Sequence, residues 1–282
     1  MKVGLLLEGG AMRGLYTAGV LDVLMENKVT VDGIVGVSAG ALFGMNYKSK
    51  QQGRVLRYNK NYAGNKNYMG FYSLLTTGNI MNEDFCFNQI VNVLDPVDFE
   101  TYVQNQVDFY AVVTNMQTGQ AEYIKLDDLK EKSQLEYLRA SGSMPFLSKP
   151  VVIDGVSYLD GGIADSIPID HIMKMGFDKV IVVLTRPNAY RKKQSNTLLP
   201  KLYYRKYPAL AEAINRRYQV YNQQLDTVQF LEEEKKIFVI RPSRLVDIKR
   251  IERNTEKIQE MYNLGQEDAR RSFRAMADYL KG

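Results

Sequence analysis

The sequence predicts an α/β fold, a three-layer sandwich in which helices cover both faces of a mainly parallel central sheet. Its short apolar runs are continuous and rich in β-branched residues, which is typical of strands that are buried on both faces. Helical patterns separate these runs, so strand and helix alternate along the chain. With 282 residues, of which 45% are hydrophobic, the chain is long enough to bury a substantial core. We therefore expect one domain over residues 1–282.

Five apolar runs predict the strands, and seven segments with helical periodicity lie around them. The strands are expected at residues 3–7, 33–37, 109–114, 180–184 and 237–240. The helices are expected at residues 13–26, 39–47, 83–93, 134–141, 169–175, 209–231 and 255–280. The dipeptide Asp154-Gly155 predicts a hairpin between residues 151–153 and 156–159, because Asp-Gly is a tight-turn signal.

Three stretches of the chain have less definite patterns. Residues 51–81 are rich in Gly, Asn and Tyr, and we interpret them as a lid over a site. Residues 187–208 form a basic, Tyr-rich connector that is expected to be mobile. The motifs described below lie within about residues 3–186, so residues 187–282 are interpreted as a C-terminal helical and strand extension of the same domain.

The composition excludes several protein classes. The single cysteine, Cys86, cannot form an intramolecular disulfide and fits a reducing compartment. The first apolar run has only four or five residues before Glu8, too few for a signal peptide, and no stretch approaches the roughly 18 apolar residues of a membrane span. With one histidine and one cysteine, a zinc site would be unusually rich in carboxylates. We expect a cytoplasmic protein that needs no metal or other cofactor.

The net charge of +5 is unevenly distributed. Residues 33–82 and 185–211 contain neither Asp nor Glu. Their basic residues are Lys48, Lys50, Arg54, Arg57, Lys60 and Lys66 in the first window, and Arg186, Arg191, Lys192, Lys193, Lys201, Arg205 and Lys206 in the second. These windows are either ordinary solvated surface or a positive field that attracts anionic head groups and brings the protein to anionic membranes. No nucleic-acid-binding motif accompanies the charge, so no nucleic acid partner is expected.

The motif Gly36-Val37-Ser38-Ala39-Gly40 follows a predicted strand and opens a predicted helix. A G-x-S-x-G sequence in this context is typical of a nucleophile elbow, where the serine occupies a strained turn and the glycines let neighbouring chains pass close by. The helix that follows favours developing negative charge at its N-terminus. Ser38 is therefore the candidate nucleophile.

The motif Glu8-Gly9-Gly10-Ala11-Met12-Arg13-Gly14 also lies between a strand and a helix. Adjacent glycines in such a loop can expose backbone N–H groups to an oxyanion, an interaction whose loss costs about 3–4 kcal/mol. Two other interpretations are a helix-start loop that packs tightly on its glycines and a dinucleotide-binding G-x-G-x-x-G loop. The dinucleotide interpretation fits poorly, because Ala11 replaces the middle glycine and no acidic residue ends the next strand.

The third motif, Asp160-Gly161-Gly162, follows a predicted strand, and makes Asp160 the candidate base. Alone it would be interpreted as a plain turn. The order Ser38, Asp160, His171 formally matches the triad of an α/β-hydrolase. Only two predicted strands precede Ser38, however, and the sequence around His171 predicts a helix start rather than a loop. We therefore interpret the chemistry as independent of histidine.

Together the motifs resemble those of bacterial patatin-like phospholipases. The matching residues are Glu8-Gly9-Gly10 with Arg13-Gly14, Gly36-Val37-Ser38-Ala39-Gly40, Arg139-Ala140-Ser141 with Met144-Pro145-Phe146, and Asp160-Gly161-Gly162. The resemblance covers residues 3 to about 186 and implies a patatin-like sandwich with a serine–aspartate dyad. It implies Ser38 as nucleophile, Asp160 as base and Gly9 and Gly10 as oxyanion donors.

The resemblance also bears on the rest of the glycine loop. Arg13 and Gly14 match the family's loop and are expected to support it, whereas Ala11 stands where the family usually carries a third glycine. Alanine is tolerated there at negative φ and is strained by about 1–2 kcal/mol at positive φ.

The resemblance implies hydrolysis of phospholipid, lysophospholipid or a related lipid ester through an acyl-enzyme on Ser38. An aspartate of ordinary pKa is a weak base, so Asp160 is expected to be partly buried or matched by hydrogen bonds. Two alternatives remain open. One is an acyltransferase in which an alcohol replaces water at the same site, and the other is a lipid- or membrane-binding module with vestigial turnover.

Overall fold

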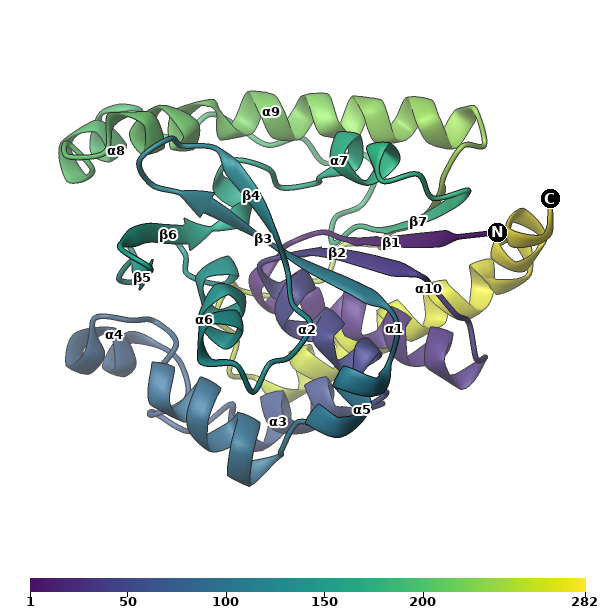
Figure 1. Cartoon of the computed structure of the whole chain (residues 1–282), viewed down its shortest axis with the longest axis horizontal. Coiled ribbons are helices and arrows are strands. Elements are labelled where there is room, and N and C mark those ends of the chain that lie inside the picture. The colour runs from purple at the N-terminus through teal and green to yellow at the C-terminus, as the bar shows by residue number, and fades with distance from the viewer.

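The computed structural model describes all 282 residues as a sandwich of three layers. Figure 1 shows a central sheet with a layer of helices above it and a thicker layer below it. The eight strands follow the order β5-β6-β3-β2-β1-β7-β8, with β4 paired to β3. They are β1 (Val3–Leu7), β2 (Gly33–Val37), β3 (Asp108–Asn115), β4 (Ala121–Lys125), β5 (Val151–Ile153), β6 (Val156–Asp160), β7 (Lys179–Val183) and β8 (Phe238–Ile240). The predicted α/β sandwich is confirmed.

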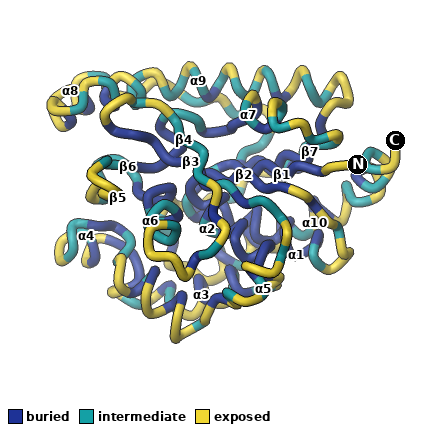
Figure 2. Tube along the Cα trace, viewed as in Figure 1, coloured by how far each residue is buried: buried dark blue, intermediate teal, exposed yellow.

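The centre of the sheet is parallel and its β6 side is antiparallel. Strands β8, β7, β1, β2 and β3 run parallel to one another, whereas β4 and β6 pair antiparallel with β3, and β5 pairs antiparallel with β6. The parallel strands β1 and β2 are buried at every residue, as their continuous apolar sequence predicts. In Figure 2 these strands form the dark, buried centre of the molecule.

The thicker helical layer packs on one face of the sheet. Its elements are η1 (Ala11–Gly14), α1 (Leu15–Glu26), α2 (Ala39–Lys48), α3 (Arg54–Tyr62), α4 (Phe71–Thr77), η2 (Asp84–Leu94), α5 (Phe99–Gln104), α6 (Lys132–Ser141) and α10 (Thr255–Lys281). Alternate residues of β1, Leu5 and Leu7 among them, join these helices in the largest hydrophobic cluster. Because successive strand residues point to opposite faces, Leu6 packs on the other side.

The opposite face is covered by fewer helices. These are α7 (Ile169–Lys174), α8 (Leu198–Tyr203) and α9 (Pro208–Glu233), and the short turn η3 (Gly161–Ile163) follows β6. Ile169, Ile172, Tyr221 and Val228 pack against the sheet in a second hydrophobic cluster. The C-terminal third contributes to all three layers, because β8 pairs with β7 while α9 and α10 lie on opposite faces of the sheet.

Several elements differ from the sequence prediction. The first predicted helix begins with the 3-10 turn η1, and the helix predicted at 83–93 is the π-helix η2. The uncertain segment 51–81 contains α3 and α4, and α5, α8 and the edge strand β4 were not predicted. None of the helices combines the length and apolar character that crossing a membrane requires.

Candidate active site

The register of β3 brings the ends of two distant strands together. One edge of β3 pairs with β4, and the other edge pairs first with β2 and then with β6. Val37 at the end of β2 lies opposite Val112, and Asp160 at the end of β6 lies opposite the next residue, Val113. Because β2 and β6 run in opposite directions, their carboxyl ends meet, and Ser38 faces Asp160.

The Ser38 hydroxyl donates a hydrogen bond to Asp160 Oδ2 at 2.7 Å. The other carboxylate oxygen, Oδ1, accepts from the Gly162 N–H at 2.8 Å. Both side chains are buried, Ser38 at 8% exposure and Asp160 at 5%. Each carboxylate oxygen of Asp160 therefore has one donor, and the serine proton already points at a base.

Burial raises the pKa of Asp160 above its ordinary value. The positive charge of Arg217, the Ser38 hydroxyl and the Gly162 amide oppose this rise because each favours the carboxylate. A raised pKa makes the carboxylate a stronger proton acceptor than an aspartate in water. This is the environment that the sequence analysis required of a base in a dyad without histidine.

The turn at Ser38 has the strained backbone of a nucleophile elbow, with φ at 54° and ψ at −123°. Its N–H donates to Ser141 Oγ at 2.9 Å, and α2 begins at the next residue. A Cβ added to Gly40 would lie 2.3 Å from the carbonyl oxygen of Leu7, and one added to Gly36 would lie 2.7 Å from Ala41. The two glycines of the motif are thus needed for close packing of β1, β2 and α2.

The glycine loop lies directly beside the serine. A Cβ added to Gly9 would come within 2.9 Å of both Ser38 Cβ and the carbonyl oxygen of Val37. The N–H groups of Gly9 and Gly10 donate to no other backbone group. Glu8 anchors the loop, because its carboxylate accepts hydrogen bonds from the Thr185 backbone and from the Tyr221 hydroxyl. The loop therefore offers two amides next to the candidate nucleophile.

The remaining loop residues take different places. Ala11 has φ at 49°, so this alanine adopts the positive-φ backbone that strains an L-residue by about 1–2 kcal/mol. Gly14 packs against α2, where an added Cβ would lie 2.8 Å from Ala39 Cβ. The backbone N–H of Arg13 closes the turn on Gly10 O at 3.1 Å. The guanidinium of Arg13 makes no hydrogen bond to the loop, and its buried Nε has no partner.

Three further residues hold the two catalytic candidates, and their roles are not apparent from the motifs. Ser141 at the end of α6 accepts from the Ser38 N–H, and two residues later the Ser143 carbonyl accepts from the Asp160 N–H at 2.8 Å. Thr114 Oγ1 donates to the Asp160 carbonyl at 2.8 Å. Ser141 lies in a stretch that carries the family resemblance, which was the one sequence signal available for it.

Two cavities meet at Ser38. The first has a volume of about 100 Å³ and extends into the thicker helical layer, and 18 of its 23 lining residues are hydrophobic. The second is a polar cleft with a volume of about 540 Å³, lined by the glycine loop, Asp160 and several cations. Ala11, Ser38, Met144 and Arg250 line both. The serine thus lies between an apolar cavity and a basic cleft.

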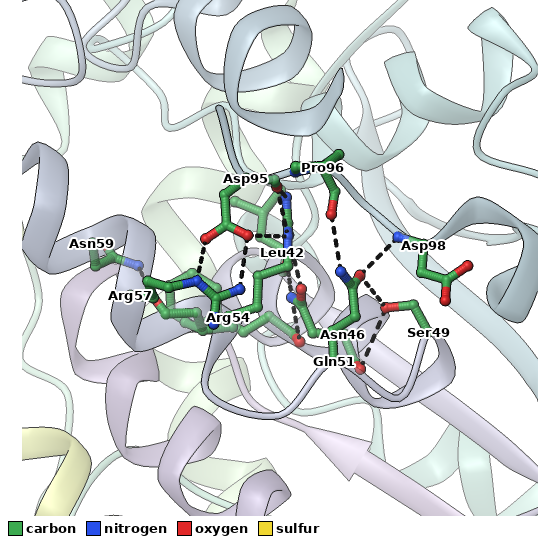
Figure 3. A network of polar contacts seen from close by, with 12 residues as sticks. Leu42, Asn46, Ser49, Gln51, Arg54, Arg57, Asn59, Asp95, Pro96 and Asp98 are labelled. Atoms are coloured by element: carbon green, nitrogen blue, oxygen red, sulfur yellow. Dashed lines mark hydrogen bonds and ion pairs between the residues drawn. The ribbon is translucent and has the colours of Figure 1, made fainter. Parts of the chain in front are cut away.

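Two of the six basic side chains of the first acid-free window are buried inside the protein. Lys48 and Arg54 are only 3% and 2% exposed. Arg54 donates to the Asp95 carbonyl and to Asn46, while Arg57 forms a bidentate pair with the Asp95 carboxylate (Figure 3). This network fixes α3 to α2 and to the end of η2, behind the apolar cavity that Arg54 helps to line. Arg54 and Arg57 therefore brace the cavity wall, whereas Lys50, Lys60 and Lys66 of the same window are exposed.

His171 lies on α7, as predicted, away from the candidate dyad. Its ring stacks on Tyr123 at a centroid distance of 3.5 Å, and it lines neither cavity at Ser38. Burial, with a smaller contribution from Lys174, lowers the pKa of His171. No group of three or more His, Cys, Asp or Glu side chains is arranged to hold a metal ion.

The fold and the paired side chains define an α/β protein with a serine–aspartate pair at the end of a parallel strand. The chain belongs to the patatin-like phospholipase family, whose model matches residues 5–173. A second model, that of a domain of unknown function (DUF6363), matches residues 207–281, which include α9, β8 and α10.

The chain is similar to curated proteins over its motif-bearing part. The uncharacterized protein YjjU of Escherichia coli (strain K12) is 27% identical over 192 residues, covering 66% of this chain and 53% of YjjU. Lysophospholipase nte1 of Aspergillus niger is 29% identical over 197 residues, covering 64% of this chain and 12% of that protein. The chain thus spans about half of the first relative and about an eighth of the second.

Two solved structures are also similar. VipD from Legionella pneumophila aligns with a TM-score of 0.47 and 14% identity, covering 97% of this chain and 67% of that chain. The type III effector protein ExoU aligns with a TM-score of 0.38 and 11% identity, covering 95% of this chain and 52% of that chain.

Proposed function

We propose that this protein is a serine acyl hydrolase that cleaves phospholipids, lysophospholipids or related lipid esters with a Ser38–Asp160 dyad. The observation that carries the proposal is the 2.7 Å hydrogen bond from Ser38 to a buried carboxylate, beside two free loop amides. Membership of the patatin-like phospholipase family and similarity to a protein named lysophospholipase support a lipid ester as substrate. The apolar cavity that starts at Ser38 supports an acyl chain as the bound group.

In the proposed mechanism Asp160 Oδ2 takes the proton of Ser38 while Oγ attacks the ester carbonyl. The electron pair of the carbonyl π bond moves onto the carbonyl oxygen. The resulting oxyanion accepts hydrogen bonds from the Gly9 and Gly10 amides. Collapse of this intermediate expels the alcohol, which takes the proton back from Asp160. Asp160 then accepts a proton from water as the water attacks the acyl-enzyme and forms a second oxyanion. Collapse of this intermediate breaks the bond between the acyl carbon and Ser38 Oγ, Asp160 returns the proton to Oγ, and the carboxylic acid is released.

We further propose that the protein contacts anionic membranes peripherally. Two short helices at one end of the molecule, α4 and α8, carry exposed apolar residues. They are Phe71 and Leu75 on α4 and Leu198 and Leu202 on α8, and all four are between 65% and 73% exposed. The segment 144–149 lies between them. Its Phe146 N–H donates to Tyr204 Oη after α8, and its Lys149 N–H donates to Asn79 Oδ1 after α4. The same segment lines the cleft at Ser38, so docking there would present lipid to the site.

Vesicle sedimentation tests this contact. We expect binding to phosphatidylglycerol vesicles that weakens as salt rises, because salt screens the charges of the second acid-free window. Leu202→Ser should weaken binding. The matched control Phe230→Ser, at the far end of α9, should leave it unchanged. Binding that does not respond to salt would contradict the electrostatic part of the proposal.

We also propose that residues 1–282 form one domain and that the protein works in the cytoplasm, where its free Cys86 stays reduced. The domain proposal is supported by β8, which extends the same sheet from the C-terminal third. Cooperative unfolding in a single transition, followed by both circular dichroism and fluorescence, is the expected result.

A fluorophosphonate probe tests the enzymatic proposal. We expect it to label Ser38 stoichiometrically in the wild type and to leave Ser38→Ala unlabelled. A lipid-binding module without turnover would remain unlabelled in both. Product analysis with and without an added alcohol then separates hydrolysis from acyl transfer, since a transferase would form a new ester at the expense of free fatty acid.

A further inference from the structure

The basic cleft at Ser38 contains cations that have no partner in the protein. Six basic side chains line it without forming any ion pair, and the exposed Lys193 is one of them, whereas the exposed Arg191 beside them pairs with Asp226. The other five are Arg13, Arg186, Lys192, Arg217 and Arg250. The first four are half-buried, and buried cations are ordinarily paired with carboxylates. Here the pairing group is missing from the protein.

The same side chains make almost no hydrogen bonds. Arg217 donates one long bond of 3.4 Å from Nε to Ser166 Oγ, and the buried Nε of Arg13 has no acceptor. Arg186 and Lys192 only stack on rings, with Arg186 4.3 Å from the Tyr190 centroid and Lys192 4.6 Å from the Tyr221 centroid. Their donors are therefore free to bind a ligand that offers several acceptor oxygens.

The cations also lie close enough to act on one another. Burial, and next the charge of Arg217, lower the pKa of Lys192 to about 7, with Arg13 and Arg250 adding to the effect and Glu8 opposing it. Burial and the charge of Arg186 lower the pKa of Arg13 to about 10. Several like charges held together without counter-charge are unfavourable, and a bound polyanion relieves the repulsion.

The cleft has no free carboxylate to pair with a positively charged head group. The Glu8 carboxylate is occupied by Thr185 and Tyr221, and the Asp160 carboxylate by Ser38 and Gly162. The rings of Tyr190 and Tyr221, which could otherwise receive a quaternary ammonium, already carry Arg186 and Lys192. A choline or ethanolamine group would meet several unpaired cations and no free carboxylate, so the cleft discriminates against zwitterionic lipids.

We propose that the cleft binds a terminal phosphate, and that the substrate is a glycerolipid with an uncapped phosphate head group, of the phosphatidic or lysophosphatidic acid class. This inference rests on the proposed hydrolysis at Ser38. Ser38 lies where the cleft joins the apolar cavity, so one lipid can place its acyl chain on one side of the ester and its phosphate on the other. A phosphate with a second pKa near 6 carries nearly two charges at neutral pH, which matches a cluster of cations better than a singly charged phosphodiester does.

The connector after β7 supplies two of these cations and is held against α9. The Lys192 backbone donates to Asn222 Oδ1 at 2.8 Å and accepts from Asn222 Nδ2 at 3.0 Å. Arg217 and Tyr221 lie on the same helix. The phosphate site therefore combines Arg13 from the motif-bearing part of the chain with cations from the C-terminal third. In this proposal the C-terminal third helps to select the substrate.

Short-chain lipids test the assignment without a membrane surface. We expect kcat/KM for monomeric dihexanoyl phosphatidic acid to exceed that for dihexanoyl phosphatidylcholine by about tenfold or more. Lys192→Gln and Arg186→Gln should each reduce this ratio severalfold by lowering kcat/KM for phosphatidic acid. Arg216→Gln, which removes an exposed cation next to Arg217 on α9, should leave the ratio unchanged. A wild-type ratio near one, or an unchanged ratio in both cleft variants, would overturn the proposal.

A binding measurement separates this proposal from the catalytic one. Calorimetry with glycerol 3-phosphate on Ser38→Ala protein should detect a site that Lys192→Gln weakens about tenfold. If no ester is hydrolysed but this binding is present, the hydrolase proposal fails and the phosphate site stands. Absence of binding would reject the phosphate site. Binding of inorganic phosphate or glycerol 3-phosphate without preference for phosphatidic acid over phosphatidylcholine would reject the head-group assignment, because the site would then serve a free phosphate.

Discussion

Substitution of Gly9 by alanine probes the glycine loop by adding one methyl group. The new Cβ would lie 2.9 Å from Ser38 Cβ and 2.9 Å from the Val37 carbonyl oxygen, closer than carbon atoms pack in proteins. Neither neighbour can yield easily, because Val37 is fixed in the sheet and the Ser38 backbone is fixed by Ser141. The loop must therefore move away from the serine by several tenths of an ångström.

This movement should affect catalysis more than folding. Overpacking of this kind costs about 1–3 kcal/mol of unfolding free energy. Loss of a well-placed oxyanion donor costs about 10²–10³ in kcat. We therefore expect Gly9→Ala to remain folded in urea titration while its kcat on p-nitrophenyl butyrate falls about a hundredfold or more.

The matched control is Gly64→Ala, since Gly64 has no atom within 4 Å of an added Cβ. It should retain wild-type kcat and stability. A Gly9→Ala enzyme whose kcat stays within about threefold of the wild-type value would refute the role of the loop amides, because loss of an oxyanion donor lowers kcat by far more.

Three further predictions concern the surroundings of the site. Ser141→Ala leaves the buried Ser38 N–H without its acceptor, so we expect the free energy of unfolding in urea to fall by about 1–3 kcal/mol and kcat to fall as well. Wild-type values for both would show that this hydrogen bond does not hold the nucleophile elbow. The preference for phosphatidic acid should decline as pH rises through about 7, because Lys192 loses its charge there. Lys192→Arg should keep the preference to higher pH, because arginine stays charged. Identical pH profiles for the two proteins would exclude Lys192 as the titrating group. Arg54→Met removes the donor shared by Asn46 and the Asp95 carbonyl, and we expect a loss of about 3 kcal/mol in unfolding free energy, against no change for the exposed control Lys50→Met.

The parallel core of the fold was predictable because its signals are local. Strands β1, β2 and β7 are continuous apolar runs, and such runs indicate burial on both faces whatever the neighbours are. The edge strand β4 was missed, because its sequence is mixed and its position depends on pairing with β3. Helix α3 was missed for a related reason. Its Arg54 can be buried only because it hydrogen-bonds Asn46 on α2 and the Asp95 carbonyl after η2, and these contacts are not visible in the local sequence.

The candidate site was predictable where a motif carries its own geometry. Ser38 and Asp160 stand at strand ends followed by glycines, and the observed positive φ at Ser38 matches the expected elbow. The sequence could not predict that Val112 and Val113 are consecutive partners of β2 and β6, which is what brings the two side chains together.

The basic cleft also lay beyond the sequence. Lys192 and Arg217 are 25 positions apart, and only the docking of the connector on α9 makes them neighbours. The two acid-free windows looked alike in composition. In the folded protein the first window braces the cavity wall through Arg54, and the second supplies cations to the cleft.

The central claim is that the Asp160 carboxylate is the base that activates Ser38. The most direct measurement is kcat of Asp160→Asn on p-nitrophenyl butyrate, with folding checked by circular dichroism. The amide keeps the size of the side chain and can still accept from the Gly162 N–H, but it cannot take a proton. We expect kcat to fall by about 10²–10⁴, as for removal of a general base. A folded Asp160→Asn enzyme with near wild-type kcat would contradict the account.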